Sequence, residues 1–285
     1  MPAKSYKSAF DFRKALEHRL QNEAKKSGQQ LQHLRRKVAF NRFLARIFAD
    51  PSSPWILKGG YAMELRLHDA RATRDIDLAL KGAATVAGPE QTSHLQKLLS
   101  NAVAKDLGDY FMFRVGAVQL ELDGPLYGGA RYPVEALLDN RLFVSFHVDV
   151  AVGDYIPTVF ETVHEEDFVG FAGIRPSAFP IIPAEVQFAE KLHAYTMPRQ
   201  VPNSRVRDLV DMVLLIQESS VSPEKTAAAL KAVFARRKNH PVPETLTAAP
   251  ANWGKSFAEM ASECGLDTDL KAGFEILERF YLKTR

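Results

Sequence analysis

The order of hydrophobic patterns along the chain limits its fold more than any other feature. Apolar residues recur at helical spacing over residues 9–26 and 31–49, and again in several segments after residue 183. Between them, residues 111–152 show the alternation and the Gly, Pro and Asn punctuation that are typical of strands. This order predicts an α+β fold, in which a mixed sheet flanked by helices is followed by a helical C-terminal domain.

The same patterns predict the individual elements. Strands are expected at 55–57, 75–80, 111–118, 132–137 and 142–152, and further helices at 61–67, 92–107, 183–197, 205–218, 223–237, 254–264 and 269–282. A loop of small residues is expected at 82–88. Residues 155–183 are interrupted by Pro and Gly and should have little regular structure. We therefore expect two domains, a core with N-terminal helices at 1–155 and a helical domain at 156–285 that contributes to the active-site cleft.

Composition narrows the class of protein. The 285 residues are 46% hydrophobic and 25% charged, which is typical of a globular protein. A net charge of +3 permits a polyanionic partner such as RNA without requiring one. Cys264 is the single cysteine, which excludes an internal disulfide and a Cys-rich zinc site. No signal peptide or membrane-spanning run is evident, so a cytoplasmic protein without membrane contact is expected.

The most informative short motif is Asp75-Ile76-Asp77. On a strand, residues two apart point to the same face, so the two carboxylates converge while Ile76 turns into the core. Converging carboxylates repel each other unless a cation lies between them, and Mg²⁺ prefers such hard oxygen ligands together with substrate phosphates. The motif alone is equally compatible with two solvated aspartates on an exposed strand face.

The residues just before this pair favour a phosphate ligand. Gly59-Gly60 follows an apolar strand and opens a helix, an arrangement that lets backbone N–H groups approach phosphate. Arg71 and Arg74 flank Thr73 and could neutralise a triphosphate. The glycine pair is equally compatible with an ordinary turn, and the arginines are equally compatible with a solvated loop, neither of which would bind phosphate.

The two segments together resemble the opening motif of the DNA polymerase β-type nucleotidyltransferase superfamily, and more closely its AbiEii branch. That branch, which includes the mycobacterial MenT-type toxins, is the toxin half of type IV toxin–antitoxin and phage-defence systems. The resemblance is carried by Lys58-Gly59-Gly60-Tyr61-Ala62-Met63-Glu64-Leu65-Arg66 and by Arg71-Ala72-Thr73-Arg74-Asp75-Ile76-Asp77-Leu78. It implies a nucleotidyltransferase core in which Lys58 and Arg66 join the nucleotide-binding residues. The superfamily often has Gly-Ser where this chain has Gly-Gly, so backbone or Thr73 contacts must replace a serine hydroxyl.

The superfamily pattern also calls for a third acid on a later strand. Asp149 lies in the middle of the apolar strand 146–152, on the face opposite its valines. Its expected role is to bind a second metal ion or to act as base for an attacking hydroxyl. Asp154 and Asp123 are weaker alternatives for the third acid. Asp149 could also be a surface aspartate without function on a half-exposed sheet.

A pair of helical segments extends the resemblance. Residues 184–194 and 205–212 resemble the E-K-L-x-A and R-D-x-x-D motifs of AbiEii-type proteins. Carried over, Lys191 would contact the nucleotide phosphates and Asp208 would orient it or assist the chemistry. Asp211 lies on the same helical face and could hold that role instead.

The resemblance implies an enzyme that uses Mg²⁺, or Mn²⁺ in its place, to transfer NMP from an NTP to RNA. The expected acceptor is the tRNA 3′ end, whose modification would block translation, and the expected partner is a cognate antitoxin that need not bind the toxin directly. Arg236, Arg237 and Lys238 form a basic cluster that could contact RNA, although a solvated helix end would look the same. The alternatives are a small-molecule nucleotidyltransferase and a non-catalytic nucleotide-binding or protein-interaction module.

Overall fold

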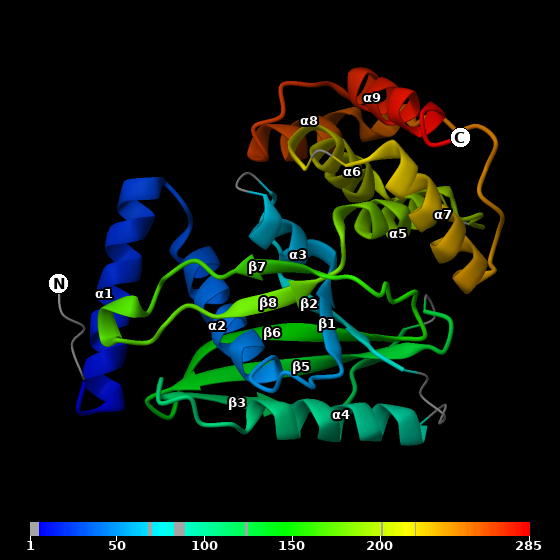
Figure 1. Cartoon of the computed structure of the whole chain (residues 1–285). Coiled ribbons are helices and arrows are strands. Elements are labelled where there is room, and N and C mark those ends of the chain that lie inside the picture. Colours follow the sequence, from blue (N-terminus) through cyan, green and yellow to red (C-terminus); the bar gives the residue numbers. More distant parts are fainter. Residues whose placement is uncertain (1–5, 68–69, 83–88, 123–124, 201, 220) are drawn as a thin grey trace. The chain divides into compact units, whose positions relative to one another are not determined.

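The computed structural model describes residues 6–67, 70–82, 89–122, 125–200, 202–219 and 221–285 (Figure 1). The chain divides into two compact units, each assembled from three separate segments. The first unit comprises Met1–Leu57, Arg74–Gly153 and Thr162–Ile181, and the second comprises Lys58–Thr73, Asp154–Glu161 and Ile182–Arg285. Most of the loop expected at 82–88 lies outside the described residues.

The first unit is built around a mixed sheet. Its strands lie in the spatial order β3-β5-β6-β2-β1-β8-β7, and β4 pairs with β5 beside this path. The strands are β1 (Trp55–Lys58), β2 (Asp75–Leu80), β3 (Phe111–Val115), β4 (Leu120–Glu121), β5 (Gly129–Leu138), β6 (Arg141–Val152), β7 (Glu161–His164) and β8 (Ala178–Ile181). The helices of this unit are α1 (Ala9–Ser27), α2 (Leu31–Ile47) and α4 (Pro89–Val103).

Two pairings position the polar residues of the sheet. Strand β2 runs parallel to β6, with Asp75 opposite His147 and Asp77 opposite Asp149. Strands β5 and β6 form an antiparallel hairpin closed by Asp139 and Asn140, both of which have positive φ. Such a two-residue turn matches the natural twist of a hairpin, and Asp and Asn tolerate the left-handed conformation that it needs.

Helices α2 and α4 cover one face of the sheet. The rings of Phe40 and Phe43 pack edge-on against Phe146 of β6, and the Tyr132 hydroxyl donates a hydrogen bond to the carbonyl of Thr92 in α4. Because side chains alternate along a strand, the neighbours of Phe146 and Tyr132 point to the opposite face. That opposite face carries Asp75, Asp77 and Asp149, while Ile76 is fully buried as predicted.

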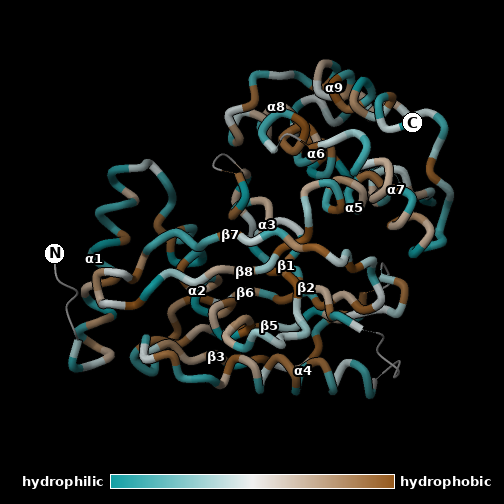
Figure 2. The backbone as a smooth tube through the Cα atoms, in the orientation of Figure 1, coloured by the Kyte–Doolittle hydropathy of each residue, from teal (hydrophilic) through white to brown (hydrophobic). Residues whose placement is uncertain are grey.

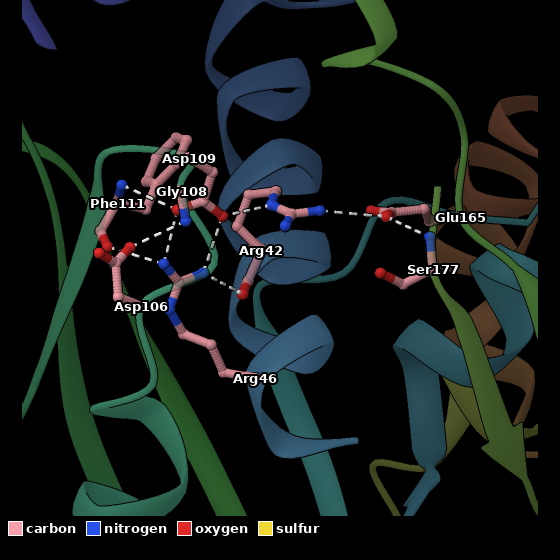
Figure 3. Close-up of polar contacts among 8 residues, drawn as sticks. All are labelled: Arg42, Arg46, Asp106, Gly108, Asp109, Phe111, Glu165 and Ser177. Carbon is pink, nitrogen blue, oxygen red and sulfur yellow. Dashed lines mark hydrogen bonds and ion pairs between the residues drawn. The ribbon is translucent and has the colours of Figure 1, made fainter. Parts of the chain in front are cut away.

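A buried network of ion pairs connects α2 to two loops of the first unit (Figure 3). Arg46 donates to both oxygens of Asp109, at 2.5 and 2.9 Å, and Arg42 donates to the same carboxylate at 2.7 Å. Arg42 also reaches Glu165, which accepts from the backbone N–H of Ser177. The network therefore joins α2 to the turn before β3 and to the segment between β7 and β8.

The second unit is mostly helical. Helix α5 lies against α6 and α7, and α6 lies against α8 and α9. Figure 2 shows α6 as largely hydrophobic, in agreement with its burial, whereas α1 of the first unit is mostly hydrophilic. The helices are α3 (Gly59–Arg66), α5 (Ala184–Thr196), α6 (Val206–Glu218), α7 (Pro223–Arg237), α8 (Gly254–Glu263) and α9 (Leu270–Leu282).

The structure confirms the predicted α+β fold with a mixed sheet flanked by helices. The expectation of little regular structure at 155–183 is wrong in part, because β7 and β8 lie there and β8 pairs in parallel with β1, at Leu57 and Ile181. The strand expected at 111–118 ends at Val115. Among the described residues, no helix combines the length and apolar character that a membrane crossing requires.

Candidate active site

The polar face of the sheet brings the three predicted acids together. Asp77 and Asp149 are register partners on the parallel strands β2 and β6, and Asp75 lies two residues before Asp77 on the same face. The side chains of Asp75 and Asp149 are 33% and 15% exposed, so both keep some access to solvent. This group of three aspartates is called the carboxylate face below.

A residue that sequence reasoning missed lies in the middle of the carboxylate face. Arg131 of β5 is the register partner of Asp149, and its guanidinium donates to both Asp149 oxygens at 2.7 Å. The same guanidinium reaches Asp75 at 3.4 Å. The hydrogen bonds from Arg131 to Asp149, joined by the charges of the carboxylate face, raise the pKa of Arg131 above its ordinary value although partial burial opposes the shift. Arg131 is therefore a fixed positive charge on this face.

His147 also borders the carboxylate face. Its Nδ1 lies 3.5 Å from a carboxylate oxygen of Asp75, its register partner. The alternation of strand 146–152 puts His147 on the same side as Asp149, but its closeness to Asp75 depends on the pairing of β6 with β2.

The donors of this face fit a hard divalent cation. Carboxylate oxygens are the ligands that Mg²⁺ prefers, and Asp75 and Asp77 present them from one face of one strand. Asp149 is different, because Arg131 already binds both of its oxygens. Within the described residues, no group of three or more His, Cys, Asp and Glu side chains is arranged around a common metal position.

The glycine turn belongs to the second unit and is shaped by two separate constraints. Gly59 has φ +66°, which favours glycine, and its carbonyl accepts a hydrogen bond from the Gln187 side chain of α5 at 2.6 Å. A Cβ on Gly60 would lie 2.7 Å from the Oγ1 of the buried residue Thr73. A serine at position 60 would therefore collide with Thr73, whose hydroxyl lies beside the turn.

The predicted lysine and aspartates of α5 and α6 form one buried cluster. Lys191 donates to Asp211 at 2.5 Å and lies 3.4 Å from Asp208, while Arg71 binds both oxygens of Asp211 at 3.1 Å. Burial alone would lower the pKa of Lys191, but Asp211 and Asp208 raise it above its ordinary value. Lys191 is therefore charged, with Asp211 as its buried partner and Asp208 as its more accessible one.

Two further residues predicted to bind nucleotide are engaged by carboxylates of the second unit. Lys58 forms ion pairs with Asp154 and with Glu190, the latter at 2.9 Å. Arg66 binds Glu161 at 2.8 Å and also donates to the Gln187 side chain. Their nucleotide contacts stay predictions. Asp154, the weaker alternative for the third acid, is paired with Lys58 in the second unit.

The predicted basic cluster does not form a single exposed surface. Arg237 is 13% exposed and binds Asp154 at 3.1 Å, so its guanidinium is directed into the network of Lys58. Lys238 is exposed, in a left-handed conformation that ends α7, and Arg236 is half-buried. Carboxylates of the second unit hold Arg237, so the solvated helix end does not describe this residue, and RNA contact by the cluster stays a prediction.

Arg74 and Asp123 are the last two of the residues predicted from the sequence. Arg74 is exposed immediately before β2 in the first unit. Asp123, the weaker alternative for the third acid, lies outside the described residues.

Comparison with known proteins identifies the family. The family described as the nucleotidyl transferase AbiEii toxin of type IV toxin–antitoxin systems matches residues 42–279. The chain belongs to the AbiEii family. This match runs from within α2 to within α9, and it confirms the family that the glycine and Asp75-Ile76-Asp77 motifs indicated.

Two solved structures resemble this AbiEii chain over most of its length. JHP933 from Helicobacter pylori is 14% identical with a TM-score of 0.49, and the alignment covers 89% of this chain and 92% of that one. A second H. pylori chain, described as a candidate nucleotidyltransferase, is 14% identical with a TM-score of 0.47, and the alignment covers 90% of this chain and 96% of that one. No curated protein matches the chain.

Proposed function

We propose that this AbiEii toxin transfers a nucleoside monophosphate from an NTP to an RNA acceptor, with the tRNA 3′ end as the target. In the proposed reaction the acceptor 3′-hydroxyl attacks the α-phosphorus, an O–P bond forms, and the bond to the β-phosphate oxygen breaks. Pyrophosphate leaves and the hydroxyl proton is released to solvent. Modification of the 3′ end would stop aminoacylation and thereby block translation.

The observation that carries this proposal is the carboxylate face within a chain of this family. Asp75 and Asp77 would hold Mg²⁺, or Mn²⁺ in its place. A bound divalent ion supplies charge neutralisation for the triphosphate. The side chains themselves contribute a rigid frame, because the register of β2 with β6 fixes the spacing of their backbones.

Within the second unit, two positive groups are suited to bind phosphate. Lys191 and Arg71 share the carboxylate of Asp211, which holds both cations in fixed positions. Fixed cations stabilise the charge that develops on a leaving pyrophosphate without the cost of reorganisation. The Thr73 hydroxyl beside Gly60 would replace the serine hydroxyl that the superfamily often uses.

The RNA acceptor and the antitoxin are proposed from the family alone. A cognate antitoxin is the expected partner of a type IV toxin, and direct contact between the two proteins is not required by this proposal. Lys238 is the better RNA contact of the basic cluster, since its side chain is exposed whereas Arg237 binds Asp154.

The test is to incubate the protein with each α-labelled NTP, Mg²⁺ and total RNA. We expect one NTP to label RNA of tRNA size, and we expect Asp75→Ala to remove the label. Asp267→Ala is the matched control, because this aspartate is exposed in the second unit. Label in a small-molecule fraction would favour a small-molecule enzyme, and NTP binding without transfer would favour a non-catalytic module. Either result would contradict the proposal.

A further inference from the structure

Arg131 already occupies the place on Asp149 that a second metal ion would need. Its Nε and one terminal nitrogen each lie 2.7 Å from a different Asp149 oxygen, and that terminal nitrogen also reaches Asp75. Paired donation of this kind is the strongest geometry that arginine offers a carboxylate, and it directs the oxygens toward the guanidinium. An ion that binds Asp149 through the same lone pairs must first displace Arg131.

The charge of the face leads to the same result. Arg131 binds Asp149 and reaches Asp75, so its positive charge offsets part of the negative charge of the carboxylate face. A second divalent cation on Asp149 would add its positive charge directly beside the Arg131 guanidinium. Repulsion between like charges a few ångströms apart is strong where solvent access is limited, as it is at Asp149.

The position of Arg131 is set by the sheet, not by a flexible loop. Arg131 lies within β5, and the register of β5 with β6 places it directly opposite Asp149. A guanidinium held from a paired strand has lost much of the freedom that weakens exposed ion pairs. The contact is therefore a fixed feature of the carboxylate face.

We propose that Arg131 is a built-in cation that takes the place of a second metal ion on Asp149, so that the carboxylate face binds a single divalent ion through Asp75 and Asp77. Arg131 acts through Asp149 and is a positioning residue. This inference rests on the proposed function, because it assumes that the carboxylate face binds metal at all.

The test is a Mn²⁺ titration of the full-length protein, in which free Mn²⁺ is measured by electron paramagnetic resonance. We expect one Mn²⁺ per wild-type chain and two per chain of Arg131→Met. Adding Asp149→Asn to Arg131→Met should return the number to one, because the new ion would use the Asp149 carboxylate. Arg131→Lys keeps the positive charge and should retain one ion.

The matched control is Arg114→Met. Arg114 lies on β3 of the same sheet and pairs with Glu135 at 3.9 Å, but its side chain is 73% exposed. This variant should bind one Mn²⁺ with unchanged affinity. If Arg131→Met does not fold, Arg131→Gln keeps a hydrogen-bond donor for Asp149 without the charge, and it should also bind two ions.

The possible outcomes separate the two proposals. One Mn²⁺ in wild type and also in Arg131→Met and Arg131→Gln, with equal affinity, would overturn the role of Arg131 and leave the proposed function standing. Two Mn²⁺ in wild type would also overturn it, since Arg131 would then exclude nothing. No Mn²⁺ in wild type would remove the metal site itself, and the proposed function would fail together with the inference.

Discussion

At the scale of single residues, Asp211 holds the charged cluster of the second unit together. Lys191 and Arg71 both bind its carboxylate, which is only 2% exposed. Asp211→Asn would leave two cations with poor access to water and without their shared counter-charge, and such losses cost about 3–5 kcal/mol. We expect a decrease of that size in the free energy of unfolding, measured by urea denaturation.

Asp208→Asn is the control for this prediction. Asp208 is more exposed than Asp211 and lies farther from Lys191, at 3.4 Å, so its loss should cost less than about 1 kcal/mol. Burial alone would raise the pKa of Asp211, but Lys191 and Arg71 lower it. The stability it contributes is therefore present above its unfolded pKa and is lost as the pH falls through the folded value. Equal losses for the two variants would show that Asp211 is not the anchor.

His193 should make the stability of the second unit depend on pH. Its side chain is 1% exposed, neither ring nitrogen has a hydrogen-bond partner within the described part of the chain, and it packs against Phe234 and His240. Burial, reinforced by Arg237 and His240, lowers the pKa of His193 to about 4. Between pH 6.5 and 4, His193 therefore binds a proton in the unfolded chain but not in the folded chain. The free energy of unfolding falls as the pH falls through this window.

The expected loss between pH 7 and pH 5 is about 2 kcal/mol, at 1.36 kcal/mol for each unit of pH below the unfolded value. His193→Leu should flatten this dependence, measured as thermal unfolding at the two pH values. The exposed His94 of α4 provides the control, and His94→Leu should unfold with the same pH dependence as wild type. An unchanged slope in His193→Leu would assign the effect to other groups.

At the scale of elements, the long periodic segments could be predicted from sequence and the contacts between them could not. Helices such as α7 and strands such as β2 follow their predicted bounds, because their pattern is local. Strands β7 and β8 escaped prediction since they are four residues long and lie among prolines and glycines. Their stability as strands comes from pairing with other strands.

Arg131 shows most clearly why part of the site was missed. The Asp139-Asn140 turn is recognisable from sequence, but counting back from it without interruption would place Arg131 opposite Val148. The register shifts by one residue between Ala136 and Leu137, and this shift brings Arg131 opposite Asp149. A bulge of this kind changes which residue lies opposite a side chain and on which face of the sheet the pair lies. The periodicity of the sequence does not reveal it.

The anchoring of α2 can be tested through Asp109. Burial alone would raise the pKa of Asp109, but Arg46 and Arg42 lower it, so the carboxylate is charged between two arginines. Asp109→Asn should lower the free energy of unfolding by about 3–5 kcal/mol, measured by urea denaturation. Asp106→Asn is the control from the same loop, since this exposed residue accepts a hydrogen bond from the backbone N–H of Gly108, and it should lose about 1 kcal/mol or less (Figure 3).

At the scale of the whole molecule, the chain passes between its two units five times, after Leu57, Thr73, Gly153, Glu161 and Ile181. A linear division at residue 155 therefore separates segments that fold together. It detaches β7 and β8 from the sheet, and it separates residues 58–73 from α5 and α6, which hold Arg66 and Arg71 through Gln187 and Asp211.

Because each unit is assembled from separate segments of the chain, the behaviour of fragments can be predicted. A fragment of residues 1–155 would leave β1 without β8, its parallel partner, and an unpaired strand edge promotes aggregation. A fragment of residues 1–181 keeps β8 and completes the sheet of the first unit. We expect fragment 1–155 to be mostly insoluble on expression, and fragment 1–181 to be recovered in greater soluble yield with a far-ultraviolet circular dichroism spectrum of mixed helix and strand. Equal soluble yields would show that β8 is dispensable for the sheet, and that residues 1–155 suffice as a folding unit.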